Sequence, residues 1–209
     1  MSEKPDYTLR TATEDDVPGV ARVLSRAFFD DPLFTWLFPD PHTRMARSAR
    51  WWAAQAGFAF VPAGAVTVAV SADPRPVVRG AAVWAPPDVS LPGGAAMLRT
   101  LPHTLGLIPL SRFPELAAFM SDLQKAAPER PYWYLQSLAV DPVAQGTGIG
   151  SALLRSGLVR ADIDRAPVYL ETTDPAVCAF YERFGFKVCG EVEEAGRPSF
   201  QSMIREPGD

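Results

Sequence analysis

The six residues Gln145-Gly146-Thr147-Gly148-Ile149-Gly150 have the composition of a loop that binds an anion. They follow Tyr132 to Val140, whose aromatic and branched residues predict a strand. They precede a helix predicted by the apolar residues of 152–159. In that setting the backbone N–H groups of the glycines and of Ser151 converge on an anion at the helix N-terminus, and glycine lets the chain approach a pyrophosphate closely.

The glycine spacing argues against two other nucleotide-binding loops. A dinucleotide-binding loop has Gly-x-Gly-x-x-Gly with an acid about twenty residues later, whereas this chain has Gly-x-Gly-x-Gly. A P-loop ends in Gly-Lys-Ser or Gly-Lys-Thr, and Gly150-Ser151 lacks the lysine. A tight strand-to-helix turn with no ligand is the alternative interpretation of the loop alone.

Three segments in order resemble the GCN5-related N-acetyltransferase (GNAT) superfamily. Gln145 to Gly150 fits its Q/R-x-x-G-x-G/A signature, Leu138 to Pro142 resembles its fourth strand, and Phe180 to Phe186 resembles its terminal helix-to-strand motif. The stretches Ala12–Pro18 and Tyr169–Thr173 are similar to puromycin N-acetyltransferase and related small-molecule acetyltransferases, although a tyrosine expected near Asp31 in the puromycin type is absent.

The resemblance implies acetyl-CoA as the cofactor, with its pyrophosphate on the glycine loop. Main-chain groups of Leu138 and Val140 would contact the acetyl and pantetheine portion, and Asp174 stands near the place where related enzymes often have an asparagine. The expected cofactor-binding residues are Leu138, Ala139, Val140, Gln145, Gly146, Thr147, Gly148, Ile149, Gly150, Ser151, Asp174 and Tyr181.

Two residues are the expected catalytic groups. The resemblance gives Tyr181 as the general acid, because a phenol with a pKa near 10 can protonate a leaving thiolate. Glu171 is the best candidate for a base that deprotonates the amine, directly or through water, with an internal salt bridge as the alternative role. Asp30 and Asp31 are second candidates that also suit helix capping, and Cys178 suits a small buried residue better than a nucleophile.

The predicted fold class is α/β (α+β), with a GNAT-like mixed, largely antiparallel sheet that contains one parallel β-loop-α-β unit. We expect a single N-acetyltransferase domain over 7–206, with a helical insertion at about 88–129 that is broken by Pro102 and Pro109. Strict alternation along the central strand would group Trp133, Leu135 and Ser137 on one face.

Composition excludes several classes of function. The 209 residues carry a net charge of −4, with no basic stripe that would neutralise nucleic acid. No apolar run is long enough to span a membrane, so we expect a cytoplasmic protein. Two cysteines and two histidines without paired spacing predict no metal site. We expect a monomer or homodimer.

These inferences favour an enzyme that moves acetyl from acetyl-CoA to the amine of a small molecule by direct attack. Two alternatives stay open: a protein lysine or N-terminal acetyltransferase, and a non-catalytic acyl-CoA-binding sensor that keeps the loop but has lost turnover.

Overall fold

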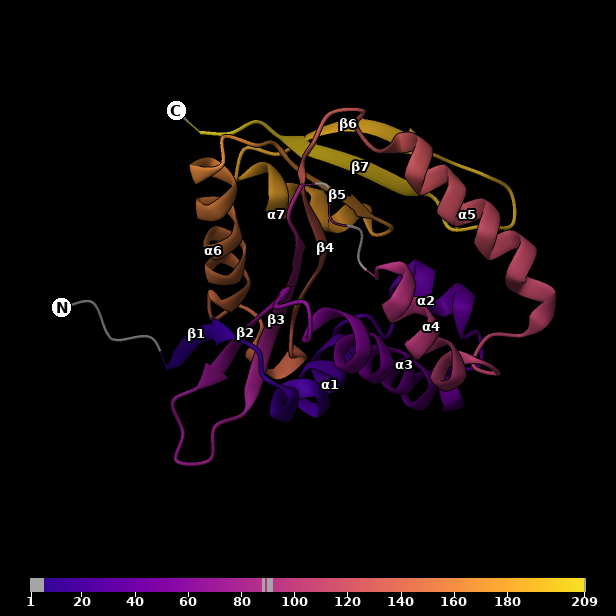
Figure 1. The fold of residues 1–209 in the computed structure, drawn as a ribbon, viewed down its shortest axis with the longest axis horizontal. Helices are drawn as coiled ribbons and strands as arrows, with labels where there is room; N and C mark the ends of the chain where they lie inside the picture. The colour runs from indigo at the N-terminus through magenta and orange to yellow at the C-terminus, as the bar shows by residue number, and fades with distance from the viewer. Residues whose placement is uncertain (1–5, 88, 90–91, 209) are drawn as a thin grey trace.

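A seven-stranded sheet flanked by helices organises the computed structural model, which describes residues 6–87, 89 and 92–208 (Figure 1). The strands are β1 (Tyr7–Thr11), β2 (Val66–Ser71), β3 (Val78–Ala85), β4 (Trp133–Val140), β5 (Val168–Thr172), β6 (Lys187–Val192) and β7 (Phe200–Arg205). The α-helices are α1 (Val17–Ala27), α2 (Pro32–Leu37), α3 (Pro41–Gln55), α4 (Gly94–Thr104), α5 (Phe113–Ala126), α6 (Ile149–Ile163) and α7 (Cys178–Glu182).

The sheet has the strand order β1-β2-β3-β4-β5-β7-β6. Neighbouring strands are antiparallel except β4 and β5, which run parallel and are joined by α6. A parallel pair needs such a crossover, whereas antiparallel neighbours can be joined by short turns. The mixed, largely antiparallel sheet with one β-loop-α-β unit is thus confirmed.

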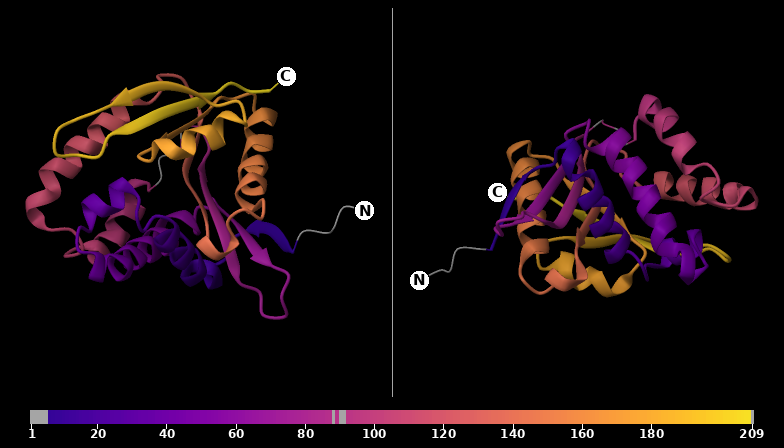
Figure 2. Two further views of the ribbon diagram at one scale, coloured as in Figure 1. Left: turned by 180° about the vertical axis from the view of Figure 1, so that it is seen from behind. Right: turned by 90° about the horizontal axis from the view of Figure 1, so that it is seen from below.

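Two apolar clusters cover the two faces of the sheet. Leu24 of α1 and Trp52 of α3 belong to one cluster. Leu154 of α6 belongs to the other, which is called the α6 cluster below. The right-hand view of Figure 2 shows the strands between these two helical layers. The glycine loop therefore starts a helix that is anchored on the face opposite α1 and α3.

β4 contains a bulge at Gln136. Ser137 pairs with Val83 and Leu135 pairs with Trp84, so Gln136 has no opposite residue on β3. Trp133 and Leu135 lie in the α6 cluster, whereas Ala139 lies in the other cluster with Val83. The predicted grouping of Ser137 with Trp133 and Leu135 is wrong, because the extra residue moves the positions after it to the opposite face.

Helix α6 approaches the sheet at a glycine. A Cβ atom at Gly157 would lie 2.1 Å from Cε2 and Cζ2 of Trp84. Trp84 is fully buried on β3, so its ring cannot move aside without opening the core. The glycine sets how closely α6, and the loop that precedes it, lie against the sheet.

The predicted helical insertion forms α4 and α5 between β3 and β4. The expected break at Pro102 is wrong, because α4 continues to Thr104. Proline removes one backbone hydrogen bond, and so close to the helix end few bonds are left to disturb. An ion pair of 2.6 Å between Arg197 and Asp122 ties α5 to the connection between β6 and β7. Trp36 of α2 donates a hydrogen bond of 3.0 Å to Gly196 O in the same connection.

Candidate functional site

The glycine loop is open and exposed. Gly146 and Gly148 have φ values of +79° and +86°, in the left-handed region that side chains other than glycine rarely adopt. A Cβ atom at either position would meet no atom within 4 Å, so the space over the loop is free. Thr147 Oγ1 donates a hydrogen bond of 2.7 Å to Ala144 O and fixes the turn. The loop is therefore an exposed stretch of backbone whose turn is held by this hydrogen bond.

The N-terminus of α6 points into this loop, with Gly148 as its N-cap. The first turn contains no acidic residue, so the unpaired N–H groups of Ile149, Gly150 and Ser151 keep their positive electrostatic potential. The Ile149 side chain is buried in the α6 cluster, which leaves its main chain for a ligand. These groups suit an anion such as a pyrophosphate.

Strands β4 and β5 diverge beside the loop. Their pairing is limited to Trp133 with Val168 and Tyr134 with Tyr169, at the start of both strands. Farther along, Asp141 N donates to Arg79 O on β3 at 2.8 Å. Backbone direction alternates along a strand, so Leu138 and Val140 turn their N–H and C=O groups away from β3, toward the opening. Ala139 turns its own toward β3, and its predicted place among the cofactor-binding residues gains no support from this geometry.

Helix α7 closes one side of the opening. A Cβ at Gly150 would lie 3.4 Å from Val140 Cγ2 and 3.9 Å from Phe180 Cζ, so the loop, β4 and α7 meet there. Tyr181 follows Phe180 and is buried, with its ring near Phe186 at a centroid distance of 5.7 Å. Burial, and to a lesser degree Cys178, raises the pKa of Tyr181 above that of a free phenol. Tyr181 is thus protonated at neutral pH, as a general acid must be, although the higher pKa weakens its drive to release the proton.

Glu171 lies on β5 among aromatic residues. Burial raises its pKa to about 7, while the hydroxyl groups of Tyr134 and Tyr169 act to lower it. Its Oε2 atom is buried, and we find no hydrogen-bond partner for it within the described part of the chain. A carboxyl group with this pKa exchanges protons near neutral pH, as a general base requires.

Comparison with known proteins agrees with this geometry. The family model described as Acetyltransferase (GNAT) domain matches residues 115–188, from α5 to β6. A Corynebacterium glutamicum structure described as histone acetyltransferase HPA2 and related acetyltransferase is 28% identical, covers 98% of both chains and has a TM-score of 0.69. The domain match and the likeness over the whole fold support membership of the GNAT superfamily.

Other relatives cover less or are more distant. Mycothiol acetyltransferase of Salinispora arenicola is 43% identical over 53 residues, which are 23% of this chain and 17% of that protein. The chain thus matches only about a sixth of the length of that curated relative. Arylalkylamine N-acetyltransferase 2 of Aedes aegypti is 12% identical, with a TM-score of 0.62 over 97% of this chain and all of that chain, and it shares the fold alone.

Two of the remaining sequence-predicted acids are helix caps. Asp31 caps α2 by accepting from Leu33 N at 2.9 Å, and it also accepts from Thr173 Oγ1, just beyond β5. Asp174 accepts from Ala176 N at 2.9 Å and caps the turn before α7. Asp30 is exposed and lies 3.9 Å from Arg44. Asp31 is thereby brought close to the strand that carries Glu171, and Asp30 is not.

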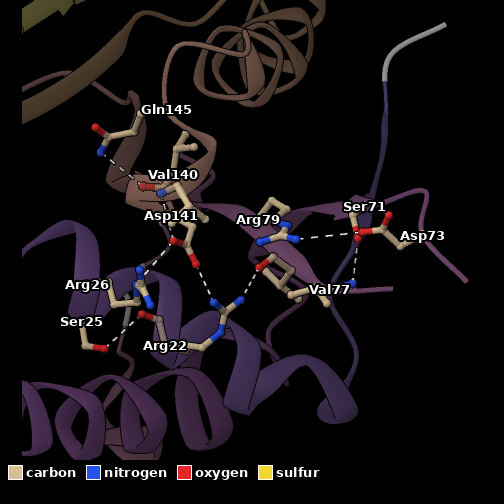
Figure 3. Close-up of polar contacts among 12 residues, drawn as sticks. Arg22, Ser25, Arg26, Ser71, Asp73, Val77, Arg79, Val140, Asp141 and Gln145 are labelled. Atoms are coloured by element: carbon tan, nitrogen blue, oxygen red, sulfur yellow. Dashed lines mark hydrogen bonds and ion pairs between the residues drawn. The ribbon is translucent and has the colours of Figure 1, made fainter. Parts of the chain in front are cut away.

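An ion-pair network around the buried carboxylate of Asp141 was not predicted from the sequence. Arg22 Nη1 lies 2.5 Å from Asp141 Oδ2 and Arg26 Nε lies 3.4 Å from Asp141 Oδ1 (Figure 3). Asp141 is fully buried, and it also accepts from Val143 N at the entry to the glycine loop. The only signal in the sequence is the spacing of two arginines four residues apart on a predicted helix, which places them on one face.

Among the described residues, no helix is long and apolar enough to cross a membrane. No group of three or more histidine, cysteine, aspartate or glutamate side chains with the arrangement of a metal site occurs in residues 6–87, 89 and 92–208.

Proposed function

We propose that this GNAT chain transfers the acetyl group of acetyl-CoA to the amine of a small molecule by direct attack. One observation carries the proposal: β4 and β5 pair over two residues and then diverge beside an open glycine loop. The opening offers backbone groups at Leu138 and Val140. At its end, the N–H groups of the glycine loop and of the first turn of α6 can bind an anion. An extended thioester with a pyrophosphate at one end matches that combination.

The chain's residues fit such a donor. The glycine loop and the first turn of α6 would hold the pyrophosphate, and the main chain of Leu138 and Val140 would hydrogen-bond the arm and the acetyl oxygen. Acetyl-CoA supplies the activated acetyl group. A backbone N–H fixed in β4 stabilises negative charge that develops on the acetyl oxygen during attack, without reorganisation.

Two side chains would handle protons. Glu171, with a pKa of about 7, accepts a proton from the acceptor ammonium and leaves a nucleophilic amine. Tyr181 holds a proton for the departing sulfur on the other side of the opening. No covalent enzyme intermediate is needed, because Cys178 is buried and burial raises the pKa of its thiol, which disfavours the thiolate.

A small acceptor is favoured over a protein. The insertion helix α5 packs on α2, where Phe119 and Trp36 have ring centroids 6.2 Å apart. It also packs on β7, where Phe119 and Phe200 have ring centroids 5.7 Å apart, and an ion pair joins it to the β6–β7 connection. A helix held in this way leaves less room for a protein acceptor than an open sheet edge would. The local likeness to mycothiol acetyltransferase supports the same choice. Cytoplasmic location, a single domain over 7–206 and a monomer or homodimer stay predictions.

The test is a screen for release of the CoA thiol over small amines and matched peptides, with mass spectrometry of the products. We expect thiol release and an acetylated product with at least one small amine and none with peptides. Transfer to peptides would favour the protein acetyltransferase instead. Tight acetyl-CoA binding without release for any acceptor would favour the non-catalytic sensor.

A further inference from the structure

A groove runs between α1 and α3. Its volume is about 700 Å³, in the range of small-molecule sites, and its lining includes Arg22, Arg26 and Phe29 on one side and Met45 and Arg50 on the other. Pro142, which leads from β4 toward the glycine loop, closes one end. None of these lining residues takes part in the acetyl transfer proposed for the chain.

The charges along the groove are unbalanced. Arg22 and Arg26 share the single carboxylate of Asp141, which lies behind them and is fully buried (Figure 3). Arg50 is exposed and forms no ion pair with any of the described residues. Asp30 is the one carboxylate on the lining itself, and it lies 3.9 Å from Arg44, outside the groove. The groove therefore carries excess positive charge.

The walls between these guanidinium groups are apolar. Phe29 and Met45 contribute side chains, and the alanines of α1 and α3 that line the groove leave room between the helices. Such walls suit an apolar body, while guanidinium groups suit a carboxylate, sulfonate or phosphate through charge-assisted hydrogen bonds. We propose that the α1–α3 groove binds a small organic anion with an apolar body, at a site separate from the acetyl-CoA site.

The separation follows from the placement of the two sites. The glycine loop meets Val140 and Phe180 near α7, and α6 lies on the face of the sheet opposite α1 and α3. The groove shares with that region only Pro142 at its rim. The proposal does not depend on acetyl transfer.

The test uses 8-anilinonaphthalene-1-sulfonate, a fluorescent anion with an apolar body, titrated against the full chain. We expect one saturable site. Arg50→Glu, on the exposed side of α3, should weaken binding about tenfold or more, because it replaces a charge-assisted contact with repulsion. Ala49→Phe should weaken binding by filling the groove.

The matched control is Arg99→Glu, the same charge reversal on exposed α4 beside Met97 and Leu98, which are 61% and 72% exposed. The dissociation constant should stay within twofold of the wild-type value. Loss of binding in Arg99→Glu but not in Arg50→Glu would assign the dye to α4 and overturn the proposal. Saturating acetyl-CoA should leave the site occupied, and full displacement of the dye would make the groove part of the cofactor site, which also overturns it.

Discussion

Thr173 Oγ1 lies 3.1 and 3.0 Å from the two carboxylate oxygens of Asp31. The contact joins the N-cap of α2 to the residue that follows β5, across 142 positions of sequence. Burial raises the pKa of Asp31, and the hydrogen bond from Thr173 opposes this rise. The turn between α1 and α2 is thereby fixed against the strand that carries Glu171.

Asp31→Ala should raise the KM for the amine several-fold and destabilise the fold by about 1 kcal/mol, the usual value of a lost N-cap. Asp40→Ala is the matched control, because Asp40 caps α3 before a proline in the same way and is exposed. It should lose similar stability with no change in KM. Steady-state kinetics measures both KM values. Equal KM effects in the two variants would show that Asp31 has no specific part in binding the amine.

Tyr181→Phe should lower kcat by roughly 10²-fold while the acetyl-CoA dissociation constant stays within twofold, because the ring still fills the α6 cluster and only the proton is lost. Tyr7→Phe makes the same change at the edge of that cluster and should leave kcat unaltered. A Tyr181→Phe enzyme with full kcat at every pH would exclude the general-acid role.

The rate should depend on pH through Glu171. A base acts when deprotonated, so kcat/KM should rise with pH through about 7 and then level off, with an acceptor amine whose pKa is high enough that it stays an ammonium throughout. Glu171→Gln should lower the plateau by about 10²-fold and remove this rise, whereas Glu191→Gln on the exposed face of β6 should keep it. Persistence of the rise in Glu171→Gln would mean that another group titrates.

Stability should depend on pH in the opposite direction. The pKa of Glu171 is about 7 in the folded chain and 4.5 as the ordinary value, so the folded state binds the proton more tightly. The contribution of Glu171 to the free energy of unfolding is fully present below pH 4.5 and is lost as pH rises through 7. The loss amounts to about 3 kcal/mol in total. Urea unfolding at pH 5 and pH 8 should show this loss in wild type and a smaller one in Glu171→Gln. An identical pH dependence in the two proteins would contradict it.

Gly148→Ala should weaken acetyl-CoA binding at least tenfold, because alanine resists the φ of +86° and the loop would change shape. Gly64→Ala places the same strain, at a φ of +65° with free space around it, in a distant turn. Both should lose about 1–2 kcal/mol of stability, but calorimetric titration should show weaker binding only for Gly148→Ala.

The glycine loop and the helix after it could be predicted from the sequence, because short-range patterns determine both. The apolar residues of 152–159 lie in α6, which begins at Ile149 within the glycine loop, because glycine punctuation and apolar periodicity act over a few residues. The cap at Asp174 follows from an acid before proline in the same way. The loop and the helix it opens were therefore predictable.

Long-range contacts were not predictable. Arg22 and Asp141 are 119 positions apart, and no local preference of either residue indicates the other. The bulge at Gln136 depends on the register with β3, which a single strand does not encode. The opening between β4 and β5 and the ties of α5 to the β6–β7 connection depend likewise on tertiary packing, so the cofactor end of the site was easier to infer than the acceptor end.

The contact between Gly157 and Trp84 has a consequence for sequence variation. The indole ring occupies the space that any side chain at 157 would need, so the two positions cannot change independently. A relative with alanine or serine at the helix position must carry a smaller residue on β3, and a relative that keeps the tryptophan must keep the glycine. The pair should therefore covary among sequences that share this sheet, although neither residue has a part in the chemistry proposed for the site.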